Sequence, residues 1–144
     1  MLKDCSLRLA ILDTKGEYMV DLYYNDNHSC YAVLISRGFG AGWSSWNKEE
    51  LAYDKRVVEW YLKHNSYEFC NRINISTSRE IETPERIEAN EFFDSIGYGK
   101  NIYFGGYKPD MLQWVPVNVP WRIREYDGSE SIEYQDSGNW NCFS

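Results

Sequence analysis

The stretch "RGFGAGWSSWN", from Arg37 to Asn47, is the first candidate for chemistry, because glycine occupies alternate positions and two tryptophans follow. Glycine-rich loops bind phosphate when backbone N–H groups and a following lysine surround the ligand. A P-loop ends in Gly-Lys-Ser/Thr, and a dinucleotide fingerprint places its third glycine where Trp43 stands. The stretch therefore matches neither phosphate-binding pattern.

Two interpretations of this stretch remain open. In the first, the glycines let a ligand such as a nucleotide approach the backbone closely, and the tryptophan rings stack on it. In the second, the stretch only connects a strand to a helix, and both tryptophans fold into the core. The first interpretation predicts a ligand-binding set made of Arg37, Gly38, Gly40, Gly42, Trp43 and Trp46.

Catalytic and metal-binding chemistry has little support in the sequence. A nucleophile usually needs a histidine base, and the chain has only His28, in an expected turn, and His64, at an expected helix end. The four cysteines form no C-x-x-C pair, which argues against a zinc site. We therefore expect a non-catalytic protein with no catalytic residue, no metal and no cofactor. The cysteines are Cys5, Cys30, Cys70 and Cys142.

The clearest local signal is a β-hairpin in "WRIREYDGSESIEYQ", the segment 121–135. Asp127 and Gly128 are a preferred pair for a two-residue type I′ turn. A turn of this length places apolar pairs on one face of the hairpin and an opposite-charge pair on the other. The resulting pairs are Ile123 with Ile132, Trp121 with Tyr134, and Arg122 with Glu133.

The same register places Glu125 directly opposite Glu130, beside the turn. Like charges in directly opposed positions destabilise a hairpin. A metal ion, a basic group of a partner, or water around a splayed hairpin tip can each relieve this cost. The additional acids and the lysine that a metal-dependent nuclease needs are not found at a convincing spacing.

Acidic and aromatic residues are concentrated from Pro109 onwards, where six acids accompany only two bases. Negative charge attracts a basic partner, and large rings supply buried area at an interface. The segment therefore suits a contact surface for a basic protein, or alternatively a solvated hairpin over an aromatic core. The predicted partner-binding residues are Trp121, Glu125, Tyr126, Asp127, Glu130, Glu133 and Asp136.

The overall composition favours the same class of partner. The 144 residues carry a net charge of -7, and 17% of them are aromatic. Nucleic-acid binding draws its strength from Lys and Arg, so we expect no direct contact with nucleic acid. No apolar run reaches the ~20 residues of a membrane span, and the first residues lack a signal-peptide pattern. These features predict a cytoplasmic protein with no membrane contact, of undetermined oligomeric state.

Strand patterns occupy the first third of the chain. Cys5–Asp13, Tyr18–Tyr24 and Ser29–Ser36 predict a three-stranded meander, with turns at Thr14–Glu17 and Asn25–His28. The segment Ser29–Ser36 is almost entirely apolar, which is typical of a strand that is covered on both faces.

Helix patterns occupy the middle of the chain. Asn47 and Glu50 can form a capping box that begins one helix, and Thr83–Pro84 begins another that ends near Gly97. The segment Tyr67–Ile75 fits either the end of a helix or a short strand. The expected apolar stripes are Leu51, Val58, Tyr61 and Leu62 in the first helix, and Ala89, Phe92, Phe93 and Ile96 in the second.

These elements predict one α+β domain that spans residues 1–144. An antiparallel sheet is built from the N-terminal meander and the C-terminal hairpin strands, with a further strand at Met111–Val115. Two helices from the middle of the chain pack on one face of this sheet.

The segments "GFGAGWSSWN", "LAYDKRVVEW", "EFFDSIGY" and "WRIREYDGSESIE" resemble parts of small uncharacterised accessory proteins of bacteriophages and prophages. The resemblance spans most of the chain and matches no named anti-CRISPR family. It implies a viral protein that blocks a host defence factor, for example a CRISPR effector, by covering a basic surface that receives nucleic acid. The alternatives are a protein that binds a nucleotide signal at residues 37–47, and an enzyme whose motif is not recognised.

Overall fold

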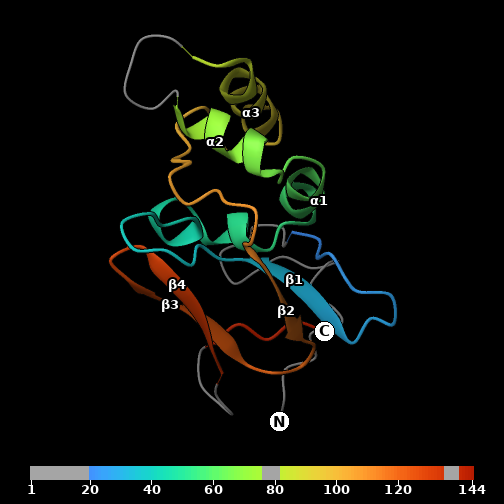
Figure 1. Ribbon diagram of the computed structural model, residues 1–144. Helices are drawn as coiled ribbons and strands as arrows, with labels where there is room; N and C mark the ends of the chain where they lie inside the picture. Colours follow the sequence, from blue (N-terminus) through green and yellow to red (C-terminus); the bar gives the residue numbers. More distant parts are fainter. Residues whose placement is uncertain (1–19, 76–81, 135–139) are drawn as a thin grey trace.

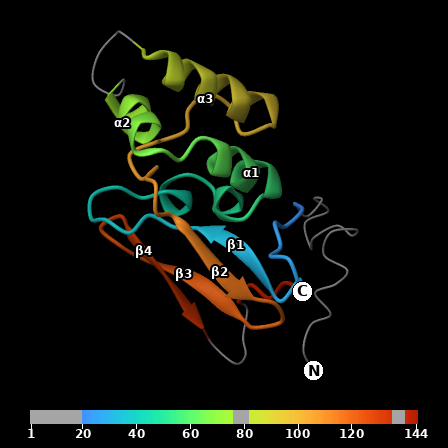
Figure 2. The same cartoon turned by 45° about the vertical axis from the view of Figure 1, so that its right-hand side comes forward.

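The computed structural model describes residues 20–75, 82–134 and 140–144. Figure 1 shows the helices gathered on one side of the strands, and the turned view in Figure 2 shows the same separation. The helices come from the middle of the chain, whereas the strands come from both sides of it in sequence. The predicted α+β composition is confirmed.

The strand β1 (Cys30–Leu34) is the centre of the first sheet. It pairs antiparallel with β2 (Leu112–Pro116) along one edge. Along its other edge the backbone N–H of Ala32 donates to the carbonyl of Tyr23 at 2.9 Å. Residues 31–34 are all fully buried, so the prediction that this segment is covered on both faces is confirmed.

The hairpin joins β3 (Trp121–Tyr126) and β4 (Ser129–Tyr134) in the predicted register. Its turn residues Asp127 and Gly128 have φ angles of 48° and 86°, as a type I′ turn requires. The opposed position of Glu125 and Glu130 is also confirmed.

The expectation of a single sheet is wrong, because the hairpin forms a two-stranded sheet of its own. Both edges of β1 are occupied, by β2 and by residues 23–25, so the hairpin has no free edge of β1 to join. It contacts the first sheet just beyond β1, where the backbone N–H of Glu130 donates to the carbonyl of Ser36 at 2.6 Å. The predicted strand Cys5–Asp13 and turn Thr14–Glu17 lie outside the described residues.

The first long helix, α1 (Lys55–Lys63), begins eight residues later than Asn47. Two 3₁₀ turns, Ser44–Trp46 and Glu49–Ala52, precede it. The N-cap is Asp54, whose buried carboxylate accepts hydrogen bonds from the backbone N–H of Arg56 at 2.9 Å and from the Tyr98 hydroxyl at 2.7 Å. An aspartate is as good an N-cap as asparagine, and the Asn47 side chain is bonded elsewhere, since its Oδ1 accepts from the backbone N–H of Tyr103 at 2.9 Å.

The helix α3 (Pro84–Ser95) follows the prediction closely. The Thr83 hydroxyl accepts from the backbone N–H of Arg86 at 3.2 Å, and Gly97 follows the helix with a φ of 99°. The ambiguous segment is a helix, α2 (Tyr67–Ile75). The chain therefore has three long helices in its described part rather than the two that we expected.

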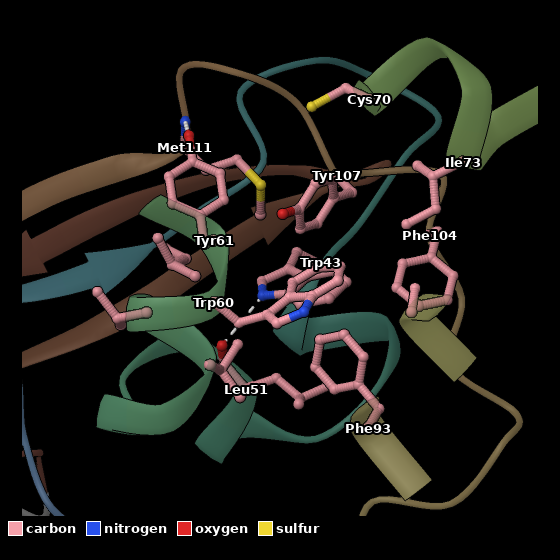
Figure 3. Close-up of a cluster of buried hydrophobic side chains, with 14 of the residues drawn as sticks. Trp43, Leu51, Trp60, Tyr61, Cys70, Ile73, Phe93, Phe104, Tyr107 and Met111 are labelled. Carbon is pink, nitrogen blue, oxygen red and sulfur yellow. Dashed lines mark hydrogen bonds between the residues drawn. The ribbon is translucent and has the colours of Figure 1, made fainter. Parts of the chain in front are cut away.

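A cluster of aromatic side chains fills the space between the helices and the first sheet (Figure 3). Trp43 lies at its centre with no exposed surface, 5.7–6.1 Å by ring centroid from Phe93, Phe104 and Tyr107. Its indole N–H donates to the carbonyl of Leu51 at 3.1 Å. The expectation that the ring of Trp43 is available to a ligand is therefore wrong, because it is part of the core.

A second cluster separates the first sheet from the hairpin. Trp121 is fully buried there, and its indole N–H donates to the Tyr31 hydroxyl at 2.6 Å. The rings of Tyr53 and Phe143 pack on it at centroid distances of 6.1 and 6.0 Å. Trp121 is therefore not a surface residue, and its assignment to the partner-binding set is corrected.

The three α-helices in the described ranges have nine to twelve residues. None of them is long and apolar enough to cross a bilayer. The longest, α3, has twelve residues, whereas a spanning helix needs about 20.

Replacement of Asp54 by alanine should lower the free energy of unfolding by about 2–3 kcal/mol, because the helix cap and a hydrogen bond to a charged group are lost together. Urea unfolding followed by tryptophan fluorescence measures this change. The exposed Glu59→Ala on the same helix is the matched control and should change stability by less than about 0.5 kcal/mol. Equal stability of the two variants would contradict the assigned cap.

Cys70 should resist thiol reagents, because burial raises the pKa of its thiol to about 11 and the thiolate is the reactive form. Iodoacetamide labelling of the native protein at pH 8, followed by peptide mass spectrometry, should modify the partly exposed Cys30 well before Cys70. In urea the two should react at similar rates. Rapid labelling of Cys70 in the native protein would show that this part of the core is open.

Candidate functional site

The glycine-containing segment 37–43 lies against the tip of the hairpin, and both ribbon views show the two segments side by side (Figures 1 and 2). The backbone N–H of Gly40 donates to the carbonyl of Asp127, and the Ser36 hydroxyl donates to the carbonyl of Gly128 at 2.7 Å. Two segments more than 80 residues apart in sequence therefore form one structural unit.

Glycine is required where these backbones meet. A Cβ atom on Gly106 would lie 2.5 Å from the carbonyl oxygen of Gly42, and one on Gly128 would overlap the backbone nitrogen of Ala41. Main-chain atoms cannot move aside as the end of a side chain can. Gly106 and Gly128 therefore allow the close approach of the protein's own backbone. A Cβ atom on Gly42 would instead meet the ring of Trp46, and Gly38 and Gly40 have open space at this position.

The carboxylate of Glu130 holds this unit together. Only 3% of the residue is exposed, and one oxygen accepts from the backbone N–H of Ser36 at 2.9 Å. The other oxygen accepts from the backbone N–H groups of Trp43 at 3.1 Å and Ser45 at 3.0 Å, and from the Ser45 hydroxyl. Converging backbone N–H groups form an anion-binding concavity. The glycine-containing loop thus binds an anion, and that anion is an internal carboxylate.

This arrangement corrects two expectations. Glu130 was expected to face a partner, but its side chain is buried and its acceptors are directed at the loop. The stretch 37–47 was expected, in one interpretation, to bind a ligand, but Glu130 already occupies the N–H groups of Trp43 and Ser45.

The opposed carboxylates of the hairpin are each stabilised by hydrogen-bond donors. Glu125 accepts from the Trp46 indole N–H at 3.1 Å and from the backbone N–H of Gly128 at 2.7 Å. Donors of the chain itself therefore offset the repulsion between the two carboxylates. Within the described ranges, no group of three or more His, Cys, Asp or Glu side chains is placed to hold a metal ion.

Four aromatic side chains remain exposed around this unit. Phe39 and Tyr126 are 71% and 77% exposed and meet edge to face with centroids 6.1 Å apart. Trp46 and Tyr103 are 42% and 39% exposed, with centroids 5.5 Å apart. We define the hairpin-tip surface as Phe39, Trp46, Tyr103, Glu125, Tyr126 and Asp127.

The remaining residues of the predicted partner set have different environments. Glu133 forms ion pairs with Arg122 at 2.8 Å and Arg124 at 3.0 Å. Desolvation raises the pKa of Glu133, but the hydrogen bonds and charges of the two arginines together outweigh it and lower the pKa overall. Its charge is therefore largely balanced locally. Asp136 lies outside the described residues.

Two members of the unit were missed from sequence. Phe39 stands between two glycines, a setting in which a ring has few local neighbours to bury it. Ser45 contributes both its backbone N–H and its hydroxyl to Glu130. No local pattern connects Ser45 with a residue 85 positions away.

Glu130→Gln should lower the free energy of unfolding by about 2–3 kcal/mol, because the amide group turns donors towards backbone N–H groups that need acceptors. Hydrogen exchange should speed up at the amides of Trp43 and Ser45. Glu125→Gln, which changes the exposed member of the opposed pair, is the matched control. It should lower the free energy of unfolding by less than about 1 kcal/mol. Unchanged exchange in Glu130→Gln would refute the role of the buried carboxylate.

Comparisons with known proteins do not assign this chain to a family. No family model, no curated protein sequence and no solved structure matches it. Its function is therefore inferred from the geometry of the hairpin-tip surface and from the sequence.

Proposed function

We propose that this protein is a non-catalytic binding protein of phage origin that blocks a host defence factor by covering a basic, nucleic-acid-receiving surface with its hairpin-tip surface. One observation carries the proposal. Two pairs of exposed rings, Phe39 with Tyr126 and Trp46 with Tyr103, lie beside a backbone that is held by a buried carboxylate and by close glycine contacts.

The rings have the properties of interface residues. Aromatic side chains bury a large area, and they dominate the binding energy of many interfaces. Trp46 is already oriented by its hydrogen bond to Glu125, and Phe39 is oriented by its contact with Tyr126. Less conformational entropy is lost on binding when the side chains are oriented beforehand.

The charge of the surface favours a basic partner. Glu125 and Asp127 are exposed at the tip, while the charge of Glu133 is balanced by Arg122 and Arg124. The local acidic contribution is thus smaller than the hairpin sequence suggests. The net charge of -7 adds long-range attraction to a positively charged partner.

The class of partner is suggested by the resemblance to phage and prophage proteins. A defence factor that handles nucleic acid, such as a CRISPR effector, has a basic surface on which acidic side chains and rings can bind. An inhibitor of this kind needs only to occupy that surface. The proposed action is therefore competition with nucleic acid.

Phe39→Ala combined with Tyr126→Ala should weaken binding to the partner by at least about 30-fold, the effect of losing ~2 kcal/mol at a hot spot. The measurement is capture from host lysate by immobilised protein, followed by titration of the purified partner. Tyr134→Ala is the matched control, because Tyr134 is exposed on the same hairpin away from the turn. The bound partner should also lose its affinity for single-stranded nucleic acid.

A second variant tests the electrostatic part of the proposal. Asp127→Asn keeps a residue that tolerates positive φ, so the turn should persist. Its association with the partner should be slower than that of the natural protein, and less dependent on salt. The proposal fails if the double aromatic variant binds as well as the Tyr134 control, or if the complex still accepts nucleic acid.

A further inference from the structure

A cleft of about 350 Å³ opens beside the first sheet, away from the residues of the hairpin-tip surface. Its walls come from the segment that precedes β1, from α1 and from β2. None of the lining residues in the described ranges belongs to the predicted sites. They are Tyr23, Tyr24, Asn25, Asp26, Leu62, Leu112 and Trp114.

Aromatic rings form much of this cleft. The rings of Tyr23 and Trp114 lie with centroids 6.3 Å apart and planes inclined by 30°. Trp114 is 43% exposed although it stands in a strand. Tyr24 is held in place by a hydrogen bond from its hydroxyl to the carbonyl of Ser144 and by stacking on His28. The ring of Tyr24 is therefore held by contacts within the chain.

Among the described residues that line the cleft, Asp26 is the only charged one. Its side chain is exposed, and the described part of the lining contains no lysine or arginine. The neighbouring turn is closed by two hydrogen bonds: the Asn25 side chain accepts from the backbone N–H of Cys30 at 2.9 Å, and the Asn25 N–H donates to the Cys30 carbonyl at 3.0 Å. Asp26 thus presents its carboxylate from a fixed backbone.

Ring faces and a carboxylate together favour a cation. The face of an aromatic ring carries partial negative charge and attracts Lys or Arg. A guanidinium group stacks on a ring and forms paired hydrogen bonds with a carboxylate, which an ammonium group does less well. Leu62 and Leu112 add apolar surface that suits the methylene groups of a long side chain.

We propose that this cleft receives an arginine side chain from a segment of a basic protein. The proposal deepens the proposed function, on which it rests for the presence of such a partner. The cleft would then be a second contact that selects arginine, while the hairpin-tip surface supplies most of the buried area. Arginine binding at the cleft itself is measurable without the partner.

The test is an NMR titration of the full chain with the peptide acetyl-Gly-Arg-Gly-amide. The indole N–H signal of Trp114, identified by its loss in Trp114→Phe, should shift and saturate at millimolar peptide. The same peptide with citrulline, which keeps the shape and lacks the charge, should give no saturable shift. The indole signal of Trp46 is the internal control and should not move.

Two variants separate this proposal from the proposed function. Asp26→Asn should weaken arginine binding about threefold, the effect of an exposed ion pair, whereas Asp127→Asn at the hairpin tip should leave it unchanged. Equal shifts with arginine and citrulline, or equal affinity in Asp26→Asn, would overturn the cleft as an arginine site. Saturable arginine binding that survives failure of partner capture would support the cleft and refute only the proposed function.

Discussion

The interaction on which this structure depends most is the buried carboxylate of Glu130. It connects the end of β1, the glycine-containing loop and β4 through backbone N–H donors at Ser36, Trp43 and Ser45. An ionised group is costly to bury unless donors surround it, and here they converge on both oxygens. Because the loop supplies most of these donors, its path is set by the hairpin that it contacts.

This path explains why two tryptophans three positions apart have opposite environments. The loop turns immediately after Trp43, so that this ring enters the helical core while Trp46 remains at the surface beside Glu125. The exposed ring of Trp46 therefore lies only one short turn from the buried ring of Trp43. A surface built in this way presents aromatic groups without the flexibility that an isolated loop would have.

The distribution of charge also depends on this packing. Of the acids that the hairpin carries, Glu130 is internal and Glu133 is balanced by two arginines, which leaves Glu125 and Asp127 at the tip. The hairpin sequence thus contains more acidic residues than its surface has unbalanced negative charges. Under the proposed function, recognition at the hairpin tip would depend mainly on rings, with charge as a contribution to encounter and selectivity.

The sequence alone determined the features whose causes are local: the hairpin register at Asp127–Gly128, the helix from Thr83 to Gly97, and the double coverage of β1. Turn propensity, capping and alternation act within a few residues, so they can be read without a fold. The separation of the two sheets, the helix start at Asp54 and the burial of Glu130 were decided by the tertiary structure. Each depends on groups far apart in sequence, whose meeting no local pattern specifies.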